Sequence, residues 1–358
     1  MPRLRIGNRW VGDGEATYFI ADIGANHDGE IERAKMLIHL AKEAGADAVK
    51  FQNFRASKIV SMRGFETLGG QLSHQAAWKK PVYEVYKEAA LPWEWTQILK
   101  TESDAIGVDY FSTPYDFEAV DMLDPLVPVF KIGSGDITWP EMLEKVAGKG
   151  KPVILSTGAS DIGDVQRAIG LILPINPKLV LMQCNTNYTT SSENLKHVHL
   201  NVLLAYCTMF PDVVLGFSDH TPGNAAVLGA VTLGARIVEK HLTDDNQRDG
   251  PDHRFAMTPD SWREMVDRTR ELELALGDAN KRVAENERES VIVQRRCLRV
   301  ARDLPAGAVL TREAIDVLRP APSDAILPYE LDAVLGMRVR SNIPKGEHLR
   351  WTMLAPSE

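Results

Sequence analysis

The stretch that decides the fold runs from residue 213 to residue 255 and reads VVLGFSDHT (213–221), PGNAAVLGAVTLGA (222–235) and RIVEKHLTDDNQRDGPDHRF (236–255). Residues 213–217 and 236–242 are rich in β-branched side chains and bounded by turn or charged residues, which is typical of buried strands. The segment between them has apolar residues at helical spacing. The stretch therefore predicts a strand–helix–strand unit in which each strand ends in a polar cluster.

Two histidines stand at the ends of these predicted strands. Ser218 and His220 leave the first strand on one face, and His241 lies at the carboxyl end of the second. Both imidazoles are therefore expected at the same rim, close to several carboxylates. This setting predicts an open, catalytic metal site with two protein ligands, completed by water and substrate oxygens. The alternative is that each histidine only caps a strand end through hydrogen bonds.

The composition predicts a soluble globular protein with one large and one small domain. The chain has 358 residues, of which 44% are hydrophobic and 25% are charged. The formal net charge of −8 and the lack of a basic stripe exclude a nucleic-acid partner, although local lysines leave an anionic small substrate open. The three cysteines, Cys184, Cys207 and Cys297, lie far apart without metal or redox spacing, so we expect buried thiols in a reducing cytoplasm.

The chain shows no sign of a membrane segment. Residues 1–16 form a short leader that is basic but has no apolar core of the kind that a signal peptide contains. No run in the sequence reaches the ~18 apolar residues of a membrane span. We therefore expect a cytoplasmic location and no membrane partner.

Strand and helix patterns alternate over about 260 residues, which matches the length and order of a (β/α)8 TIM barrel. A doubly wound open sheet is the competing α/β architecture, but it does not usually place polar residues at every strand end. Residues 54–90 interrupt the rhythm and predict a loop plus helix, with aromatics such as Trp78 and Tyr86, over one barrel end. The predicted strands are 17–24, 46–53, 109–113, 129–133, 152–157, 179–184, 213–217 and 236–242, and the predicted helices are 30–44, 93–106, 117–123, 141–146, 164–173, 201–209, 222–235 and 261–276.

The predicted strand ends carry lysines, amides and hydroxyls that suit a phosphate and a carboxylate. Lys50 shares a strand face with Gln52 among apolar neighbours, where a lysine is costly unless an anion pairs with it. The alternative for Lys50 is a structural ion pair, for which Glu239 is the candidate partner. The full rim comprises Asp22, Asn26, Lys50, Gln52, Thr113, Tyr115, Lys131, Ser134, Ser156, Thr157, residues 185–188, Ser218, His220 and His241.

The chain changes character after residue 277. Residues 278–294 are charged and poor in core side chains, so we expect a linker or an exposed helix. From residue 295 to residue 358 short strand patterns alternate with PAG and IPKG turns, without helix–strand alternation. This pattern predicts a small, mostly-β second domain after a catalytic domain of residues 1–277.

Eight ordered motifs give the chain a family resemblance: ADIGANHDG, AGADAVKFQ, FSTPYD, FKIGSGD, ILSTGAS, GFSDHTPG, IVEKHLTDD and GPDHRF. The chain resembles the sialic acid synthases, including their legionaminic and pseudaminic acid relatives, and its tail resembles their antifreeze-like SAF (β-clip) domain. The resemblance implies a transferase that condenses phosphoenolpyruvate with an N-acylated hexose, giving a nine-carbon 3-deoxy-2-keto sugar acid and phosphate. It also implies a divalent metal, Mn or Mg, and a homodimer in which the tail of one chain acts in trans on the other.

The resemblance also implies roles for individual residues. His220 and His241 would be the metal ligands, and Asp22, Lys50 and Lys131 the catalytic side chains. Asp22 stands where the family usually has a longer Glu. Residues 185–189 read NTNYT, without the proline that follows the tyrosine in the family, a departure that points to a different acceptor. The residues implied in substrate binding are Lys50, Thr113, Lys131, Ser134, Ser156 and Ser218 for phosphoenolpyruvate, and Gln52, Tyr188, Asp252 and Arg295 or Arg296 for the acceptor.

Two other functions remain open from the sequence. The first is a Schiff-base aldolase of a 2-keto-3-deoxy sugar acid, in which Lys50 or Lys131 forms the covalent adduct. The second is a non-catalytic protein that binds a sugar or a peptide, with the tail as the working module. The intact ring of polar strand ends argues against the second.

Overall fold

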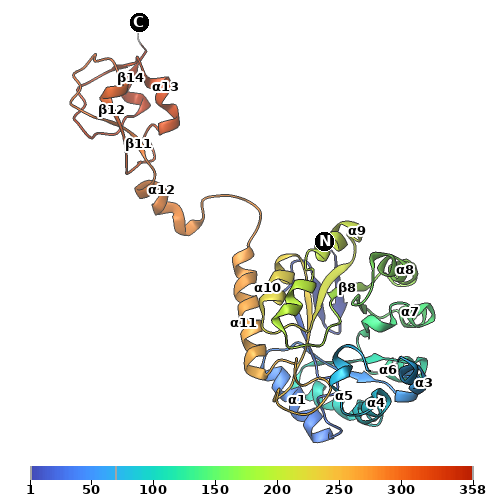
Figure 1. Ribbon diagram of the computed structural model, residues 1–358. Coiled ribbons are helices and arrows are strands. Elements are labelled where there is room, and N and C mark those ends of the chain that lie inside the picture. Colours follow the sequence, from blue (N-terminus) through green and yellow to red (C-terminus); the bar gives the residue numbers. More distant parts are fainter. Residues whose placement is uncertain (1, 69–70, 357–358) are drawn as a thin grey trace. The chain divides into compact units, whose positions relative to one another are not determined.

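The computed structural model describes residues 2–68 and 71–356. The chain divides into two compact units, Met1–Gly277 and Asp278–Glu358. The first unit is built around an eight-stranded sheet in the order β5-β4-β3-β10-β9-β8-β7-β6, and its helices surround the sheet (Figure 1). Its strands are β3 (Tyr18–Asp22), β4 (Ala48–Asn53), β5 (Asp109–Pro114), β6 (Phe130–Ile132), β7 (Val153–Ser156), β8 (Leu179–Cys184), β9 (Val214–Asp219) and β10 (Ile237–His241).

The strand pairing confirms the predicted TIM-like barrel. All paired neighbours in the sheet are parallel. The first and last strands of this sheet in the sequence, β3 and β10, pair with each other, and β5 and β6 at the two ends of the strand order are in contact, so the sheet closes upon itself. This cyclic order excludes the doubly wound alternative, and it brings the carboxyl ends of all eight strands to one mouth.

The outer helices begin and end where local side chains favour it. The Asp116 side chain accepts a hydrogen bond from the Ala119 amide at the start of α6, and Asp161 and Asp164 form a capping box at the start of α8. Gly107 ends α5 with a φ of 69°, a conformation that glycine adopts readily. The helices are α1 (Ile31–Glu43), α5 (Trp95–Ile106), α6 (Phe117–Leu123), α7 (Pro140–Ala147), α8 (Ile162–Ile172), α9 (Val202–Met209), α10 (Ala225–Thr232) and α11 (Pro259–Leu276).

The segment expected as a leader is instead a β-hairpin of β1 (Arg3–Ile6) and β2 (Arg9–Gly12). Leu4, Ile6 and Val11 belong to the barrel core. The sequence carried a signal for this hairpin, because polar and apolar residues alternate around the two turn residues 7 and 8. The leader prediction was therefore wrong.

The described residues of the insertion after β4 form four short helices, in agreement with the predicted loop plus helix. They are α2 (Ala56–Ile59), α3 (Met62–Thr67), the 3-10 helix η1 (Ser73–Ala77) and α4 (Val82–Ala89). The amphipathic helix α4 carries Val82, which is buried. The insertion therefore has its own local structure above β4.

The prediction of three buried cysteines is wrong for one of them. Cys184 and Cys297 are buried, but Cys207 is exposed. Cys207 lies on α9, where Leu203 and Tyr206 form the buried face. No helix in the part of the chain that the structure describes is long and apolar enough to cross a membrane.

The second unit is small and mostly β, as predicted. Its two antiparallel pairs are β11 with β12 and β13 with β14. Leu298, Leu310 and Leu349 belong to a core of its own. Its elements are the 3-10 helix η4 (Glu285–Glu287), α12 (Arg288–Gln294), β11 (Cys297–Val300), η5 (Arg312–Ala314), β12 (Ile315–Leu318), η6 (Pro328–Glu330), α13 (Leu331–Val334), β13 (Arg338–Val339), η7 (Trp351–Met353) and β14 (Leu354–Ala355).

Candidate functional site

The mouth of the barrel collects the polar side chains that the sequence placed at strand ends. Asp22 ends β3, Thr113 is the last residue but one of β5, and His241 ends β10. These side chains are buried although they are polar, which marks a site rather than a solvated rim. Lys50, Lys131, Ser156, Ser218 and His220 are also buried at the mouth.

One buried ion pair joins Lys50 to Asp22. The Lys50 Nζ lies 2.7 Å from the Asp22 Oδ2, and the Gln52 amide donates to the same oxygen at 3.2 Å. Burial raises the pKa of the Asp22 carboxyl, but the charges of Lys50 and His241 more than offset that effect and hold the pKa below its ordinary value. Burial lowers the pKa of Lys50, but Asp22 and Glu239 together hold it above its ordinary value. Both groups are therefore charged.

A second buried pair joins Lys131 to Glu239. The Lys131 Nζ lies 3.4 Å from the Glu239 Oε1, which also accepts a hydrogen bond from Ser218 at 3.2 Å. The other oxygen, Glu239 Oε2, is buried without a hydrogen-bond partner among the described residues. Glu239, the partner that the sequence suggested for Lys50, thus pairs with Lys131. Lys50 pairs with Asp22 instead.

The serine-bearing turns that follow the neighbouring strands β6 and β7 contact each other at the mouth. The Ser134 hydroxyl accepts a hydrogen bond from the Gly158 amide at 2.9 Å. A Cβ on Gly158 would lie 1.9 Å from the Thr186 Oγ1 and 2.9 Å from the Ser134 Oγ, so a larger residue there would displace these side chains. Among the described residues, the one hydrogen-bond partner of the Ser156 hydroxyl is the Met182 sulfur, a weak acceptor at 3.8 Å. The hydroxyl can therefore turn from this sulfur to a ligand.

His220 and His241 lie together, as the side-chain alternation predicts. Their ring centroids are 5.6 Å apart. The His220 Nδ1 lies 3.0 Å from the Asn185 carbonyl oxygen, a contact that fixes the ring and leaves Nε2 as a lone-pair donor. The His241 Nδ1 is buried without a hydrogen-bond partner among the described residues, and Nε2 lies 3.3 Å from the Asp22 Oδ2.

These two imidazoles fit a shared divalent ion. Two rings that each hold a nitrogen about 2.1 Å from one ion have centroids within about 6.5 Å of each other, a condition that the pair meets. Residues 2–68 and 71–356 contain no group of three or more His, Cys, Asp or Glu side chains that could hold a metal. Any ion at this position would therefore take its remaining ligands from water and substrate.

The loop after β10 places Asp252 over the mouth. The Asp252 Oδ2 accepts from the Ala25 amide at 3.0 Å and lies 3.8 Å from the His241 Nδ1. The next residue, His253, is fully buried and contacts the Thr243 hydroxyl at 2.7 Å and the Asp28 carboxylate at 2.8 Å. Because a carboxylate only accepts, the His253 Nε2 donates to Asp28. This arrangement fixes the loop that carries Asp252.

Tyr188 also reaches the site, whereas the tail arginines belong to the second unit. The Tyr188 ring lies 4.3 Å from the His220 ring and 5.2 Å from the Phe255 ring, measured between centroids. Arg295 and Arg296 directly precede β11 and are exposed, and Arg296 donates to the Val317 carbonyl at 2.9 Å.

Several side chains that border the site were not predicted from the sequence as site residues. His74, Trp78 and Tyr86 come from the insertion and line a cavity of about 150 Å³ together with Gln52 and Asp252. The aromatic residues of the insertion were a visible signal, but only the folded chain shows that they meet Gln52 and Asp252.

Asp136 also borders the site and was not predicted from the sequence as a site residue. It ends the 3-10 helix η2 (Ser134–Asp136), and its Oδ2 is buried without a hydrogen-bond partner among the described residues. Burial raises the pKa of Asp136 to about 6, and the charge of Lys131 offsets this only in part.

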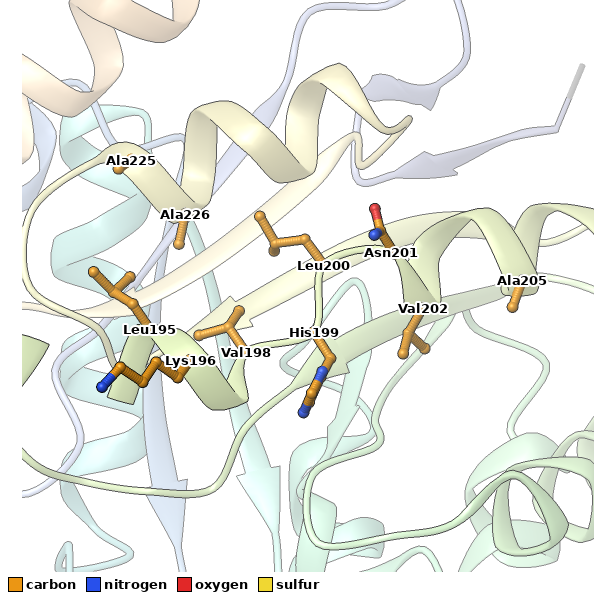
Figure 2. A pocket seen from close by; sticks show the side chains of 10 residues that line it. All are labelled: Leu195, Lys196, Val198, His199, Leu200, Asn201, Val202, Ala205, Ala225 and Ala226. Atoms are coloured by element: carbon orange, nitrogen blue, oxygen red, sulfur yellow. The ribbon is translucent and has the colours of Figure 1, made fainter. Parts of the chain in front are cut away.

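A larger cavity, of about 720 Å³, lies elsewhere on the first unit (Figure 2). It is bordered by the 3-10 helix η3 (Ser192–His197), α9 and α10. Its lining is mostly apolar and includes Leu195, Val198 and Leu200. It contains none of the mouth residues described above, so the candidate site is the smaller cavity and the adjoining rim.

Comparisons with known proteins agree with this picture. The chain matches the NeuB family over residues 37–281 and the SAF domain over residues 295–355. It is 34% identical over 346 residues, 95% of each chain, to the N,N'-diacetyllegionaminic acid synthase of Legionella pneumophila. It is 32% identical over 311 residues, 85% of this chain and 83% of the relative, to the N-acetylneuraminate-9-phosphate synthase of Homo sapiens.

Solved structures show the same similarity. The spore coat polysaccharide biosynthesis protein spsE of Bacillus subtilis is 30% identical, with a TM-score of 0.65 over 99% of this chain and 100% of that chain. The N-acetylneuraminic acid synthetase of Leptospira borgpetersenii is 26% identical, with a TM-score of 0.71 over 81% of this chain and 95% of that chain.

The raised pKa of Asp136 predicts a pH-dependent stability. A carboxyl whose pKa is higher in the folded chain than in the unfolded chain stabilises the fold at low pH, and this contribution is lost as the pH rises from about 4 through about 6. We expect Asp136→Asn to unfold like the parent at pH 4 and to be more stable at pH 7, by about 1–3 kcal/mol. Urea unfolding between pH 4 and pH 7 measures this difference.

The matched control is Asp267→Asn, because the Asp267 side chain is 56% exposed. Its effect on the free energy of unfolding should stay within about 0.5 kcal/mol at every pH. An Asp136→Asn effect that is the same at pH 4 and pH 7 would contradict the prediction.

Proposed function

This chain belongs to the NeuB family, and we propose that it is a synthase that condenses phosphoenolpyruvate with an N-acylated hexose. The product would be a nine-carbon, sialic-type 3-deoxy-2-keto acid, released together with phosphate. The observation that carries the proposal is that two buried lysines and two histidines face one barrel mouth. Relatives that are 34% and 31% identical to this chain are named as synthases of legionaminic and pseudaminic acids.

Phosphoenolpyruvate would occupy the lysine side of the mouth. Its phosphate and carboxylate need fixed positive charge and hydrogen-bond donors. Lys50 and Lys131 supply the charge, and each is already held in place by a carboxylate partner at 2.7 and 3.4 Å. The hydroxyls of Thr113, Ser134 and Ser156 supply the donors, and Ser218 would join them by turning its O–H from Glu239 to the ligand.

The acceptor sugar would lie on the side of the insertion. Gln52, Tyr188 and Asp252 line the cavity of about 150 Å³ that opens beside His241. An amide, a phenol and a carboxylate together can donate to and accept from sugar hydroxyls. Burial holds the pKa of Tyr188 well above its ordinary value, so its hydroxyl stays protonated and can donate.

A divalent ion would be held by His220 and His241. When bound, it would act as a Lewis acid on the aldehyde oxygen of the open-chain acceptor. The chain itself keeps both rings in place through Asn185 and Asp22, at 3.0 and 3.3 Å. Side chains that are held in a fixed orientation lower the activation barrier, because the reacting groups are positioned before the reaction begins.

The bond changes follow from the two substrates. C3 of phosphoenolpyruvate attacks C1 of the aldehyde, and the aldehyde oxygen takes up a proton and becomes a hydroxyl. Water then adds to C2, and phosphate leaves with the bridging oxygen, so C2 becomes the keto carbon. Asp22 is fixed by donors from Lys50 at 2.7 Å and from the Gly24 amide at 3.0 Å. We propose that this carboxylate orients the attacking water.

The geometry speaks against the Schiff-base alternative. A lysine must lose its proton before it can attack a carbonyl. Lys50 is held in its charged form, because its pKa is raised by Asp22 and Glu239 in spite of burial. Lys131 likewise lies beside a carboxylate.

The test of the proposed reaction is product analysis by mass spectrometry with a panel of N-acyl and di-N-acyl hexoses. We expect a product whose mass equals the acceptor plus phosphoenolpyruvate plus water minus phosphoric acid. Phosphoenolpyruvate labelled with ¹⁸O at the bridging position should deliver its label to inorganic phosphate. Label in the sugar acid would show cleavage of the P–O bond and would exclude the mechanism.

The metal proposal is tested by removal and restoration. Chelation should abolish turnover, and Mn²⁺ or Mg²⁺ should restore it. His220→Ala should lower kcat by at least about 100-fold, because a Lewis acid contributes several kcal/mol. Equilibrium dialysis should show about one Mn²⁺ per parent chain and a much weaker site in the variant. His39→Ala is the control, because the His39 side chain is 46% exposed. Turnover that survives chelation would contradict the metal proposal.

We further propose that the chain forms a homodimer in which the tail unit acts on the partner's barrel. The resemblance supports this arrangement. Residues 278–290 are exposed, as a connection between separate units would be. Arg295 or Arg296 would then reach the acceptor bound by the other chain.

Mixing two inactive variants tests the trans arrangement. An Arg295/Arg296 double alanine variant keeps its barrel, and His241→Ala keeps its tail. A 1:1 mixture of exchanging dimers should regain about a quarter of parental activity, because half of the dimers are mixed and each has one complete site. Mixing His241→Ala with His220→Ala is the control and should restore nothing. Verified mixed dimers without activity would count against trans action.

A further inference from the structure

Two loops that border the mouth are joined by a histidine to which the proposed reaction assigns no role. The first loop connects β3 to α1 and contains NHDG (26–29), and the second connects β10 to α11 and contains GPDHRF (250–255). His253 in the second loop is fully buried. Its Nε2 donates to the Asp28 carboxylate at 2.8 Å, and its Nδ1 lies 2.7 Å from the Thr243 hydroxyl. The ring therefore ties the first loop to the chain just after β10.

The order of hydroxyl, imidazole and carboxylate is that of a hydrolytic triad, but this group cannot act as one. In such a triad the hydroxyl attacks the substrate, so a substrate must be able to reach it. Thr243 and His253 are both fully buried. Thr243 is also fixed by its backbone, because its amide donates to the Met257 carbonyl at 2.9 Å. The group is therefore an internal tie between two loops.

The same two loops meet a second time at Asp252, the residue before His253. The Asp252 Oδ2 accepts from the amide of Ala25, three residues before Asp28, at 3.0 Å. A Cβ on Gly24 would lie 2.6 Å from this oxygen, and the φ of Gly24 is 52°, so the close approach favours a glycine there. Two hydrogen bonds thus join the loops side by side, one inside the protein and one at the mouth.

The part of the second loop that precedes Asp252 has few buried side chains. Residues 245–250 are exposed or half-buried. This run is held at its start by the buried Arg33, which donates to Asp244 at 2.9 Å. At its other end, His253 is the first buried residue. Segments with few buried contacts open readily, so the buried ring of His253 determines where Asp252 lies.

We propose that His253 is a positioning residue for the proposed reaction: through its bond to Asp28 it holds Asp252 at the mouth, where Asp252 binds the acceptor sugar. The effect on the acceptor rests on the proposed function, whereas the position of Asp252 does not. A carboxylate that is already held in place binds a sugar hydroxyl without first losing the freedom of its side chain and loop. Loss of the His253 ring should therefore weaken acceptor binding and spare phosphoenolpyruvate, which would lie on the lysine side.

Hydrogen exchange of the Ala25 amide, followed by mass spectrometry with residue-level fragmentation, tests the position of Asp252 without any turnover. Asp252→Ala removes the acceptor of this amide and sets the scale of full release. We expect His253→Ala to speed the exchange at least about tenfold, because the loss of a hydrogen bond to a charged group corresponds to a factor of this size. His253→Gln keeps an N–H donor near the place of Nε2 and should stay within about threefold of the parent. Unchanged exchange in Asp252→Ala or in His253→Ala would overturn the proposal.

Further variants separate this tie from a general loosening of the fold. Thr269→Ala is the matched control, because Thr269 is also fully buried but lies on α11, and it should leave the exchange of Ala25 unchanged. Asp28→Gly removes the carboxylate and suits the φ of 53° at this position, so it should act like His253→Ala. The two changes combined should speed the exchange no more than either alone, since both remove the same bond. Effects that multiply would contradict the assignment.

Steady-state kinetics test the consequence for the reaction. His253→Ala should raise KM for the acceptor at least about tenfold and keep KM for phosphoenolpyruvate within about twofold of the parent, and His253→Gln should recover most of the loss. Equal rises of both KM values without recovery in His253→Gln would show a general structural role and overturn the proposal, and so would faster exchange with an unchanged KM for the acceptor. If no acceptor gives a product, the proposed function fails, and the exchange of Ala25 alone then decides whether His253 positions Asp252.

Discussion

Two lysines that point into a parallel barrel require two carboxylates, and this charge balance ties the site to the closure of the sheet. Lys50 finds Asp22 on the neighbouring strand, where the two residues are direct register partners. Lys131 finds Glu239 at 3.4 Å, although β6 and β10 stand four places apart in the strand order. In a flat sheet such strands would lie about 19 Å apart. The second pair therefore forms only because the sheet closes.

The same closure explains how much of the fold the sequence could predict. Strand and helix patterns alternate with enough regularity to give the order of the elements, and eight such units have one common closed arrangement. The amino-terminal hairpin was missed because its polar positions, such as Arg5 and Arg9, hide an apolar face of Leu4, Ile6 and Val11. The burial of Cys207 was predicted wrongly, because α9 lies in an apolar stretch but still exposes one face of the helix, which carries Cys207.

The site was predictable only where strand alternation determines it. Alternation places His220 and His241 at one rim, and the structure has their rings 5.6 Å apart. The partner of Lys50 depends on strand register, which the sequence does not reveal, and so Glu239 was proposed in place of Asp22. The rings of His74 and Tyr188 lie 4.7 Å apart, between centroids, and a contact between two such distant loops follows from the folded chain alone. The tail arginines belong to a unit with its own core.

The two faces of β10 differ in how their buried polar atoms are satisfied. The Lys240 ammonium, on the outer face of β10, has three acceptors in Asp219, Thr221 and Gly223 within 3.1 Å. On the inner face of the same strand, Glu239 Oε2 and His241 Nδ1 are buried without partners among the described residues. Each such atom costs about 1–3 kcal/mol. A ligand that supplies the missing partners recovers this free energy on binding, so the unsatisfied atoms favour the occupied site. The surrounding ion pairs hold them in position beforehand, and little reorganisation then remains for the reaction itself.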